Sequence, residues 1–417
     1  ILNLAIGVRF PYRVPRRLQK SLFFCIFASV MYKIVIASDS FKGSLSSIEV
    51  AESVEKGILD VLPSCNVVKV AVADGGEGTK EALCQTLGGK TVEIPVEDPI
   101  GRTINASYVI LEDGITAVLE MSSASGLTLL TPSERNPMRT STYGTGQLIA
   151  DALGRGCRRF LTGIGGSATN DGGMGMLEAL GYRFMDADGN ELSGIGASLS
   201  KVCRIDDSRV LQAVHESEFI VACDVDSPLY GQDGAAYVFA PQKGADPEMV
   251  RALDDGLRHF AEVTAMYMNS SENGSSANLD KKDGCLLFNG NVIQDMSSMP
   301  GAGAAGGLGY AFVTFLGARL KRGVDMVLDA IGFDKMIEGA DLVITGEGRI
   351  DAQTFTGKTP YGVLQRASRQ GIPVMALAGL VDLDGSSGFT AIRQITPPDM
   401  RLSEAMLPAV ASANLRR

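Results

Sequence analysis

Short apolar runs typical of strands alternate with helical segments at both ends of this chain. Lys33–Ser38 is a β-branched run, and the capping box Ser46–Glu49 opens a helix. A second strand at Asn66–Ala73 precedes the tight DGGEGT turn and a helix at Thr79–Leu87. Because strands joined through helices lie parallel in one sheet, this alternation predicts a doubly wound α/β fold.

The pattern changes in the middle of the chain. From Thr91 to Met121, successive strands are divided by DPIG and EDG turns, which favours antiparallel or mixed pairing. The strand–helix pattern returns after residue 295. We therefore expect a Rossmann-like domain built from residues 31–95 and 295–417, with a second, mixed α/β domain inserted at 96–294. The polar stretch 269–284 within it is expected to be a flexible surface insertion.

Residues 1–30 differ from the rest of the chain. They carry basic residues, and no acid precedes Asp39. We interpret this stretch as a basic leader or a translation artefact, because Met31 directly precedes a good strand. A genuine targeting peptide remains the alternative and would direct the chain to an organelle. Otherwise a cytoplasmic location is expected, because the seven cysteines include no CxxC pair and fit a reducing compartment.

Charge and hydropathy exclude two classes of partner. The net charge of −10 has the wrong sign for broad contact with nucleic acid. No segment approaches the ~18 uninterrupted apolar residues of a transmembrane helix, so no membrane partner is expected. The chain is thus expected to act on a small molecule.

Polar, glycine-rich loops follow five of the predicted strands, where open α/β sheets bind ligands. Their candidate residues are Asp39, Ser40 and Lys42; Asp74 and Glu77; Gly165, Gly166, Ser167, Thr169, Asn170 and Asp171; Asp224; and Glu347, Arg349, Asp351 and Lys358. Glycines beside Ser, Thr and Lys let backbone N–H groups face an anion, and nearby carboxylates can hold Mg²⁺ or accept a proton. This combination of backbone N–H groups, cations and carboxylates indicates phosphoryl transfer. With only two histidines in the chain, the base is expected to be a carboxylate.

Two motif matches do not fit their usual context. Residues 301–306 (GAGAAG) satisfy the dinucleotide-binding pattern, but no strand precedes them, so close packing at the start of a Gly/Ala helix is the better interpretation. Residues 352–359 resemble a relaxed Walker A motif that begins too far beyond the preceding strand. Lys358 remains a candidate phosphate contact without that fold.

The loops also carry a family resemblance. The following segments occur in this order along the chain: IVIASDSFKGSLS, VADGGEGT, EMSSASGL, RNPMRTSTYGTGQLI, GIGGSATNDGGMGMLEALGYRF, ACDVDSPLYG, FAPQKGA, GAGAAGGLG and VITGEGRIDAQTFTGK. In these segments and their order, the chain resembles the type 1 glycerate kinase family. The resemblance runs from about Met31 to the end. It implies two α/β domains with a site in the cleft between them, and phosphorylation of D-glycerate with ATP and Mg²⁺. The chain departs from the family pattern in its leader, in the 269–284 insertion and in a shortened stretch after Gly379 with an early stop at Arg417, where we expect a truncated terminal helix.

The resemblance supports a hypothesis for the roles of the individual candidate residues. Lys42 and Arg349 are expected to bind the substrate carboxylate or phosphate, and the GGSATNDGG loop to hold a phosphate. Asp171 is the first choice for the base, followed by Asp351 and Asp224, and Glu347 is the candidate Mg²⁺ contact. On this hypothesis, Asp171→Asn leaves the fold intact and lowers kcat by orders of magnitude. The other candidate residues are expected to contact substrate or phosphate.

Several alternatives stay open at this stage. The acceptor could be another small hydroxy acid, such as hydroxypyruvate or tartronate. A dehydrogenase using GAGAAG and a binding protein without turnover rank lower. Phosphorylation of the 2-hydroxyl is favoured over the 3-hydroxyl, although one base could reach either, and homo-oligomerisation is undecided.

Overall fold

The computed structural model describes residues 31–273, 280–282, 285–288, 291–293, 296–383 and 388–417. The described residues divide into two compact units, one formed by residues 31–74 with 327–417 and the other by residues 75–326. We call them the terminal unit and the inserted unit. Both are α/β, as the sequence predicts. The expected leader, residues 1–30, lies outside the described residues.

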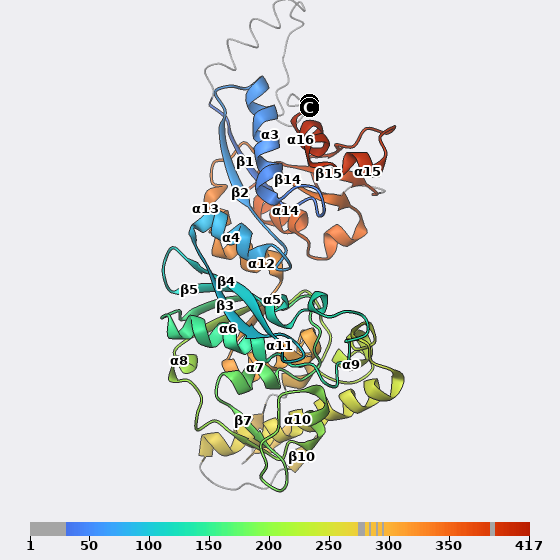
Figure 1. Cartoon of the computed structure of the whole chain (residues 1–417). Coiled ribbons are helices and arrows are strands. Elements are labelled where there is room, and N and C mark those ends of the chain that lie inside the picture. The colour runs from blue at the N-terminus through green and yellow to red at the C-terminus, as the bar shows by residue number, and fades with distance from the viewer. Residues whose placement is uncertain (1–30, 274–279, 283–284, 289–290, 294–295, 384–387) are drawn as a thin grey trace, which may run out of the picture. The chain divides into compact units, whose positions relative to one another are not determined.

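The terminal unit contains a five-stranded parallel sheet with the order β16-β15-β14-β1-β2. Blue β1 and β2 from the N-terminal part combine with orange-red elements from the C-terminal part (Figure 1). The strands are β1 (Lys33–Ser38), β2 (Asn66–Ala71), β14 (Leu342–Ile350), β15 (Val374–Val381) and β16 (Ala391–Gln394). The doubly wound sheet is thus confirmed.

Helices of the terminal unit bury the faces of this sheet. Helix α3 (Ser47–Val61) begins at the expected capping box, in which Ser46 and Glu49 bond to each other's backbone N–H groups. Its buried side, including Val50 and Val54, packs with Ile34 and Ile36 of β1. The other helices are α12 (Gly323–Ala330), which crosses the unit boundary, α13 (Phe333–Met336), α14 (Thr359–Arg369), α15 (Leu402–Ala405) and α16 (Pro408–Arg416). Helix α16 packs against α3, where Arg416 pairs with Asp60.

The inserted unit contains a six-stranded mixed sheet with the order β13-β9-β6-β5-β4-β3. Pairing is antiparallel from β3 to β5 and parallel from β5 to β13, which confirms the change of pattern expected at residues 91–121. The strands are β3 (Gly89–Glu97), β4 (Thr103–Leu111), β5 (Thr116–Glu120), β6 (Arg159–Gly163), β9 (Glu218–Ala222) and β13 (Arg319–Lys321).

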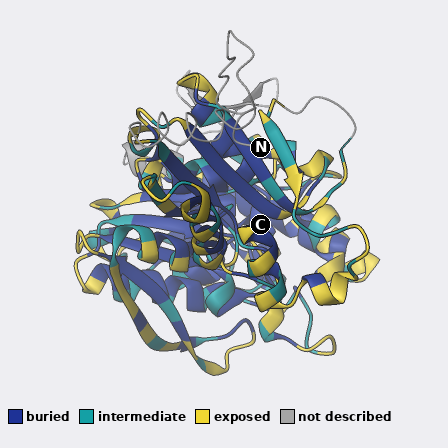
Figure 2. Ribbon diagram, turned by 90° about the horizontal axis from the view of Figure 1, so that it is seen from above, coloured by how far each residue is buried: buried dark blue, intermediate teal, exposed yellow. Residues whose placement is uncertain are grey.

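Helices and short strands complete the inserted unit. They are α4 (Thr79–Leu87), α5 (Ser122–Ser125), α6 (Tyr143–Gly154), α7 (Met174–Ala179), α8 (Gln212–His215), α9 (Ala235–Phe239), α10 (Pro247–Asn273), α11 (Ala304–Leu316), β7 (Arg183–Met185), β8 (Arg204–Asp206), β10 (Asp280–Lys282), β11 (Cys285–Phe288) and β12 (Asn291–Ile293). Strand β5 is buried along its whole length and β6 along all but its first residue; buried residues are dark blue in Figure 2. Phe160 and Phe219 stack across β6 and β9 with centroids 4.8 Å apart, at the centre of the core.

The unit boundaries differ from the residues 95 and 295 expected from the sequence. Strand β3 pairs along its whole length with β4, and α4 packs on β4, so residues 75–95 belong to the inserted unit. At the other boundary, α11 packs in the core of the inserted unit and β13 extends its sheet. Both unit boundaries therefore depend on the pairing of strands within the sheet, which the local sequence pattern does not reveal.

Other elements differ in length from the prediction. The expected strand at 341–345 extends to Ile350, so Glu347 and Arg349 lie within β14 and not in a loop after it. Helix α10 continues to Asn273, into the expected insertion at 269–284, and β10 pairs with β11 beyond it. The rest of that insertion lies outside the described residues.

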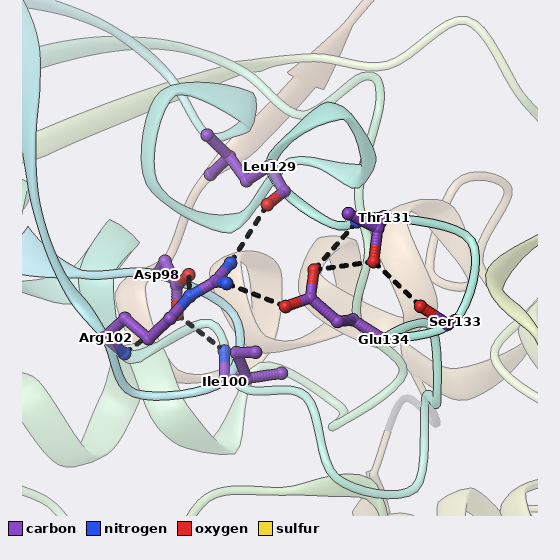
Figure 3. Close-up of polar contacts among 7 residues, drawn as sticks. All are labelled: Asp98, Ile100, Arg102, Leu129, Thr131, Ser133 and Glu134. Atoms are coloured by element: carbon purple, nitrogen blue, oxygen red, sulfur yellow. Dashed lines mark hydrogen bonds and ion pairs between the residues drawn. The ribbon is translucent and has the colours of Figure 1, made fainter.

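A charged network ties loops of the inserted unit together (Figure 3). The buried carboxylate of Asp98 accepts hydrogen bonds from the backbone N–H groups of Ile100 and Arg102 and from the Arg102 guanidinium. Arg102 also donates to Glu134 (2.8 Å) and to the Leu129 carbonyl (3.1 Å). Because the buried carboxylate is fully paired, we interpret this network as structural.

Within the described part of the chain, none of the helices combines the length and apolarity that a bilayer crossing requires.

Candidate active site

A cavity of about 310 Å³ lies in the terminal unit, at the carboxyl ends of its strands. Sequence-predicted residues from β14, from the loops after β1 and β2 and from the start of α14 line it together: Asp39, Ser40, Lys42, Asp74, Glu347, Arg349 and Lys358. Asp39 follows β1, Asp74 follows β2 after two intervening residues, and Glu347 lies in β14. Residues from both ends of the chain are therefore brought into one site.

The sheet order explains why the cavity forms here. From β1 the chain moves to β2 on one side, whereas β14, β15 and β16 extend the sheet on the other side. The winding direction thus changes between β1 and β14, and such a switch point leaves a crevice at the carboxyl ends of the strands. The backbone N–H of Asp39 donates to the Gly346 carbonyl at 2.9 Å, which joins the two strands where the crevice opens.

Asp39 is a buried carboxylate that lines this cavity. Its side chain is 7% exposed, and its oxygens accept hydrogen bonds from the Ser40 N–H (2.7 Å) and the Thr359 hydroxyl (3.1 Å). Burial, together with the neighbouring negative charge of Asp74, raises the pKa of Asp39 to about 6. A cavity carboxylate with this pKa can both lose and accept a proton near neutral pH.

Three cations line the cavity, and each is paired with a carboxylate. Lys42 Nζ lies 3.6 Å from Asp74 Oδ2, and Lys358 Nζ lies 3.3 Å from Glu347 Oε2. Arg349 pairs with Asp351 at 3.3 Å and also with Asp382. An anionic ligand could exchange with these acidic partners, because exposed ion pairs contribute little stability.

Glu347 has the properties of a carboxylate that could contact Mg²⁺. Its Oε1 accepts a hydrogen bond from the Thr354 hydroxyl at 2.6 Å, which orients the group. Burial raises the pKa of Glu347, while Thr354 and Lys358 oppose this shift. Among the described residues no group of three or more His, Cys, Asp or Glu side chains could hold a metal alone. Mg²⁺ is commonly held by one or two carboxylates with substrate phosphates, so Glu347 fits such an ion.

The GGSATNDGG loop of the inserted unit divides into an exposed and a buried part. Gly165 and Gly166 are exposed, whereas Ser167, Thr169 and Asn170 are buried. The amide oxygen and nitrogen of Asn170 are buried without a hydrogen-bond partner in the described structure. Only the glycine end of this loop therefore remains available to a ligand.

Lys243 fixes this loop from inside and was missed by the sequence reasoning. Its ammonium is fully buried and donates to Ser167 Oγ (2.7 Å) and to the Thr169 carbonyl (2.6 Å). Burial lowers the pKa of Lys243 to about 7. The only signal in the sequence was a lysine following the apolar residues of FAPQK.

The position of Asp171 argues against its role as the base. Its side chain is 0% exposed, and its carboxylate accepts four hydrogen bonds: two from Thr142 (both 2.7 Å) and one each from the backbone N–H groups of Gly173 and Gly175 (both 3.2 Å). Burial raises the pKa of Asp171, and these hydrogen bonds oppose the shift. A carboxylate so enclosed cannot reach a substrate hydroxyl, so we assign it to the architecture of the loop and of α7.

The remaining acidic candidates also have local partners. Asp351 is the N-cap of the short 3₁₀ helix Ala352–Thr356, where it accepts from the Gln353 N–H. In the inserted unit, Asp224 accepts from the Gly323 N–H at 3.0 Å, and Glu77 lies in the turn before α4. None of the three is among the residues that line the described cavity.

The GAGAAG segment packs against backbone, as the sequence reasoning favoured. Ala305, Gly306 and Gly307 have positive φ angles. A Cβ added at Gly306 would lie 2.1 Å from the Thr169 carbonyl oxygen, and the Gly172 N–H donates to the Gly306 carbonyl. These glycines therefore permit close contact between α11 and the GGSATNDGG loop.

Comparisons with known proteins identify the family of this chain. The model of the glycerate kinase family matches residues 34–417. A glycerate kinase of Bacillus subtilis is 44% identical over 89% of this chain and 92% of its own length, and a glycerate 2-kinase of Escherichia coli is 45% identical over 83% and 85%. A crystal structure from Salmonella typhimurium LT2, which carries the provisional name glycerate kinase 2, has a TM-score of 0.80 at 40% identity and covers 93% of this chain and 96% of its own.

The fold, the cavity and these relatives define the class of the protein: an α/β phosphotransferase with an alcohol group as acceptor. Within that class, the chain belongs to the glycerate kinase family.

Proposed function

We propose that the chain transfers the γ-phosphoryl group of ATP to the 2-hydroxyl of D-glycerate, giving 2-phosphoglycerate and ADP. The cavity carries this proposal, because it combines carboxylates with cations at the switch point of a parallel sheet. The choice of the 2-hydroxyl follows the name of the E. coli relative, glycerate 2-kinase.

In this proposal Asp39 replaces Asp171 as the base that accepts the proton of the glycerate hydroxyl. Asp39 lines the cavity and is held by Ser40 and Thr359. Arg349 and Lys42 bind the glycerate carboxylate, and Lys358 lies toward the transferred phosphoryl group. This division matches the preference of guanidinium and ammonium groups for such anions.

Mg²⁺ would be held by Glu347 together with phosphate oxygens and water. When bound, it would neutralise charge on the phosphoryl group. Thr354 keeps the Glu347 carboxylate in one orientation through its 2.6 Å hydrogen bond.

The proposal also includes a phosphate contact in the inserted unit, the family branch and the cellular location. Gly165 and Gly166 remain candidates for phosphate contact because they are exposed at a glycine turn. We also propose the type 1 branch of the family, on the motifs quoted above, and a cytoplasmic location, which the free cysteines fit.

The pH dependence of turnover tests the role of Asp39. A base must be ionised to accept a proton, so kcat/KM for glycerate should rise through the Asp39 pKa of about 6 and level off above it. Initial rates at saturating ATP between about pH 5 and pH 8 would show this. A profile without an inflection in this interval would exclude Asp39 as the titrating base.

Arg349→Ala should raise the KM for glycerate by roughly tenfold to a hundredfold, because a charge-assisted pair with the carboxylate is lost. Arg401, an exposed arginine at the N-cap of α15, provides a matched control, and Arg401→Ala should leave KM unchanged. Steady-state kinetics with varied glycerate would measure this KM. An unaltered KM in Arg349→Ala would show that Arg349 does not bind the carboxylate.

A panel of acceptors tests the proposed substrate. ADP release should depend on D-glycerate and be much slower with L-glycerate, hydroxypyruvate or tartronate. Faster release with one of the other acids would retain the phosphotransferase class and replace glycerate as the acceptor.

A further inference from the structure

The cavity of the terminal unit has an apolar half as well as a polar one. Leu380 and Ile395 lie at the ends of the neighbouring strands, and Leu402, Ala405, Met406 and Ala411 come from the C-terminal segment. Met406 lies beside the loop after β1, because a Cβ added at Gly43 would approach Met406 Cε to 3.1 Å. The C-terminal segment thus forms a wall of the same cavity that Asp39 and Lys42 line.

Three of the large side chains of this wall are exposed, and Ile395 is half-buried. Leu380 is 44% exposed, Leu402 71% and Met406 39%. Single exposed apolar residues need no explanation, but several gathered at one cavity indicate a surface that a ligand covers.

Glycerate alone does not account for this wall. It is a three-carbon acid with a carboxylate and two hydroxyls, so it has little apolar surface to bury. The cavity volume of about 310 Å³ falls in the range of ~300–1,000 Å³ typical of sites for considerably larger ligands.

We infer that the apolar wall formed by Leu380, Ile395, Leu402 and Met406 binds the purine base of the nucleotide. The inference rests on the proposed function in so far as ATP is the phosphoryl donor. A purine is flat and largely apolar on its faces, so it suits aliphatic side chains, whereas its phosphates require cations. The phosphates then extend toward Lys358, at the start of α14.

The sheet topology supports this orientation. Leu380 lies in β15, and Ile395 directly follows β16, so the wall is displaced from the switch point toward one edge of the sheet. The polar half lies at the β1 and β14 ends, where the switch point favours phosphate binding. One cavity can thus hold base and phosphates along the row of strand ends.

Photolabelling locates the base directly. The full chain would be irradiated with 8-azido-ATP and digested, and the labelled peptides identified by mass spectrometry. We expect labelling within residues 380–411 that excess ATP suppresses and excess inorganic tripolyphosphate suppresses less effectively. Specific labelling confined to peptides from residues 75–326 would overturn the inference.

Two variants measure the contribution of the wall. Leu402→Ala and Met406→Ala should each weaken ADP binding by about five- to tenfold in calorimetry, since a few methylene contacts are lost, and leave pyrophosphate binding unchanged. Leu407→Ala is the matched control, because Leu407 is 54% exposed in the same segment and is not a lining residue of the described cavity. Equal ADP affinity in all three variants and the wild type would contradict the inference.

The inference and the proposed function can fail separately. If the variants weaken ADP binding but glycerate is not phosphorylated, only the proposed acceptor is wrong. If glycerate is phosphorylated and the KM for ATP is unchanged in both variants, the base binds elsewhere.

Discussion

Asp39→Asn is expected to lower kcat by about 10²–10⁴-fold while the protein stays folded. This is the usual contribution of a general base, and asparagine cannot accept the proton of the hydroxyl. The substitution is nearly isosteric, and the amide can still accept from the Ser40 N–H and bond to the Thr359 hydroxyl. Circular dichroism and rapid-quench kinetics would separate folding from chemistry.

The stability of the same variant provides an independent check. Because the pKa of Asp39 is raised to about 6 in the folded state, ionising this group costs folding free energy as the pH rises from the ordinary Asp pKa through 6. Asp39→Asn should therefore have a higher Tm than the wild type at neutral pH and little advantage at about pH 4.

Asp334→Asn, which changes an exposed carboxylate of the terminal unit, serves as the control and should retain full activity. If Asp39→Asn turns over at close to the wild-type rate, the base is another residue.

Asp171→Asn is expected to destabilise the inserted unit by about 2–4 kcal/mol, because the two carboxylate oxygens accept four hydrogen bonds in a fully buried position. Asparagine offers one oxygen, so its NH₂ group must face a backbone N–H donor, and a buried polar group is left unpaired. Urea unfolding monitored by circular dichroism would measure the loss.

Asp351→Asn is the matched comparison, because Asp351 caps a short helix and asparagine caps equally well. Its free energy of unfolding should change by less than about 0.5 kcal/mol. A fully stable Asp171→Asn protein with kcat reduced by orders of magnitude would restore Asp171 as the base and contradict our assignment.

The sequence predicted the fold class and the charged residues of the cavity. Alternating β-branched runs and capped helices identified the parallel sheet, and the strand ends of such a sheet meet at one edge. For this reason the local pattern was sufficient to group Asp39, Asp74 and Glu347. The unit boundaries at Asp74 and Met326 could not be predicted in this way, since they depend on the pairing of β3 with β4 and of β13 with β9.

Burial was the property that the loop sequences did not reveal. Asp171 and Asp39 both follow apolar strands in polar loops that contain glycine, yet Asp171 is enclosed by Thr142 and α7 while Asp39 opens onto a cavity. Lys243 was missed because its partners, Ser167 and the Thr169 carbonyl, are distant in the sequence. The wall residues Leu402 and Met406 were missed because apolar residues in a short helix usually indicate core packing.

The most direct test of the account is ³¹P NMR of the products formed by the full chain from D-glycerate, ATP and Mg²⁺. We predict that the γ-phosphate signal of ATP is replaced by a phosphomonoester signal that coincides with added 2-phosphoglycerate, in amounts equal to the ADP formed. ATP that stays intact, or that yields only inorganic phosphate, would contradict the central claim.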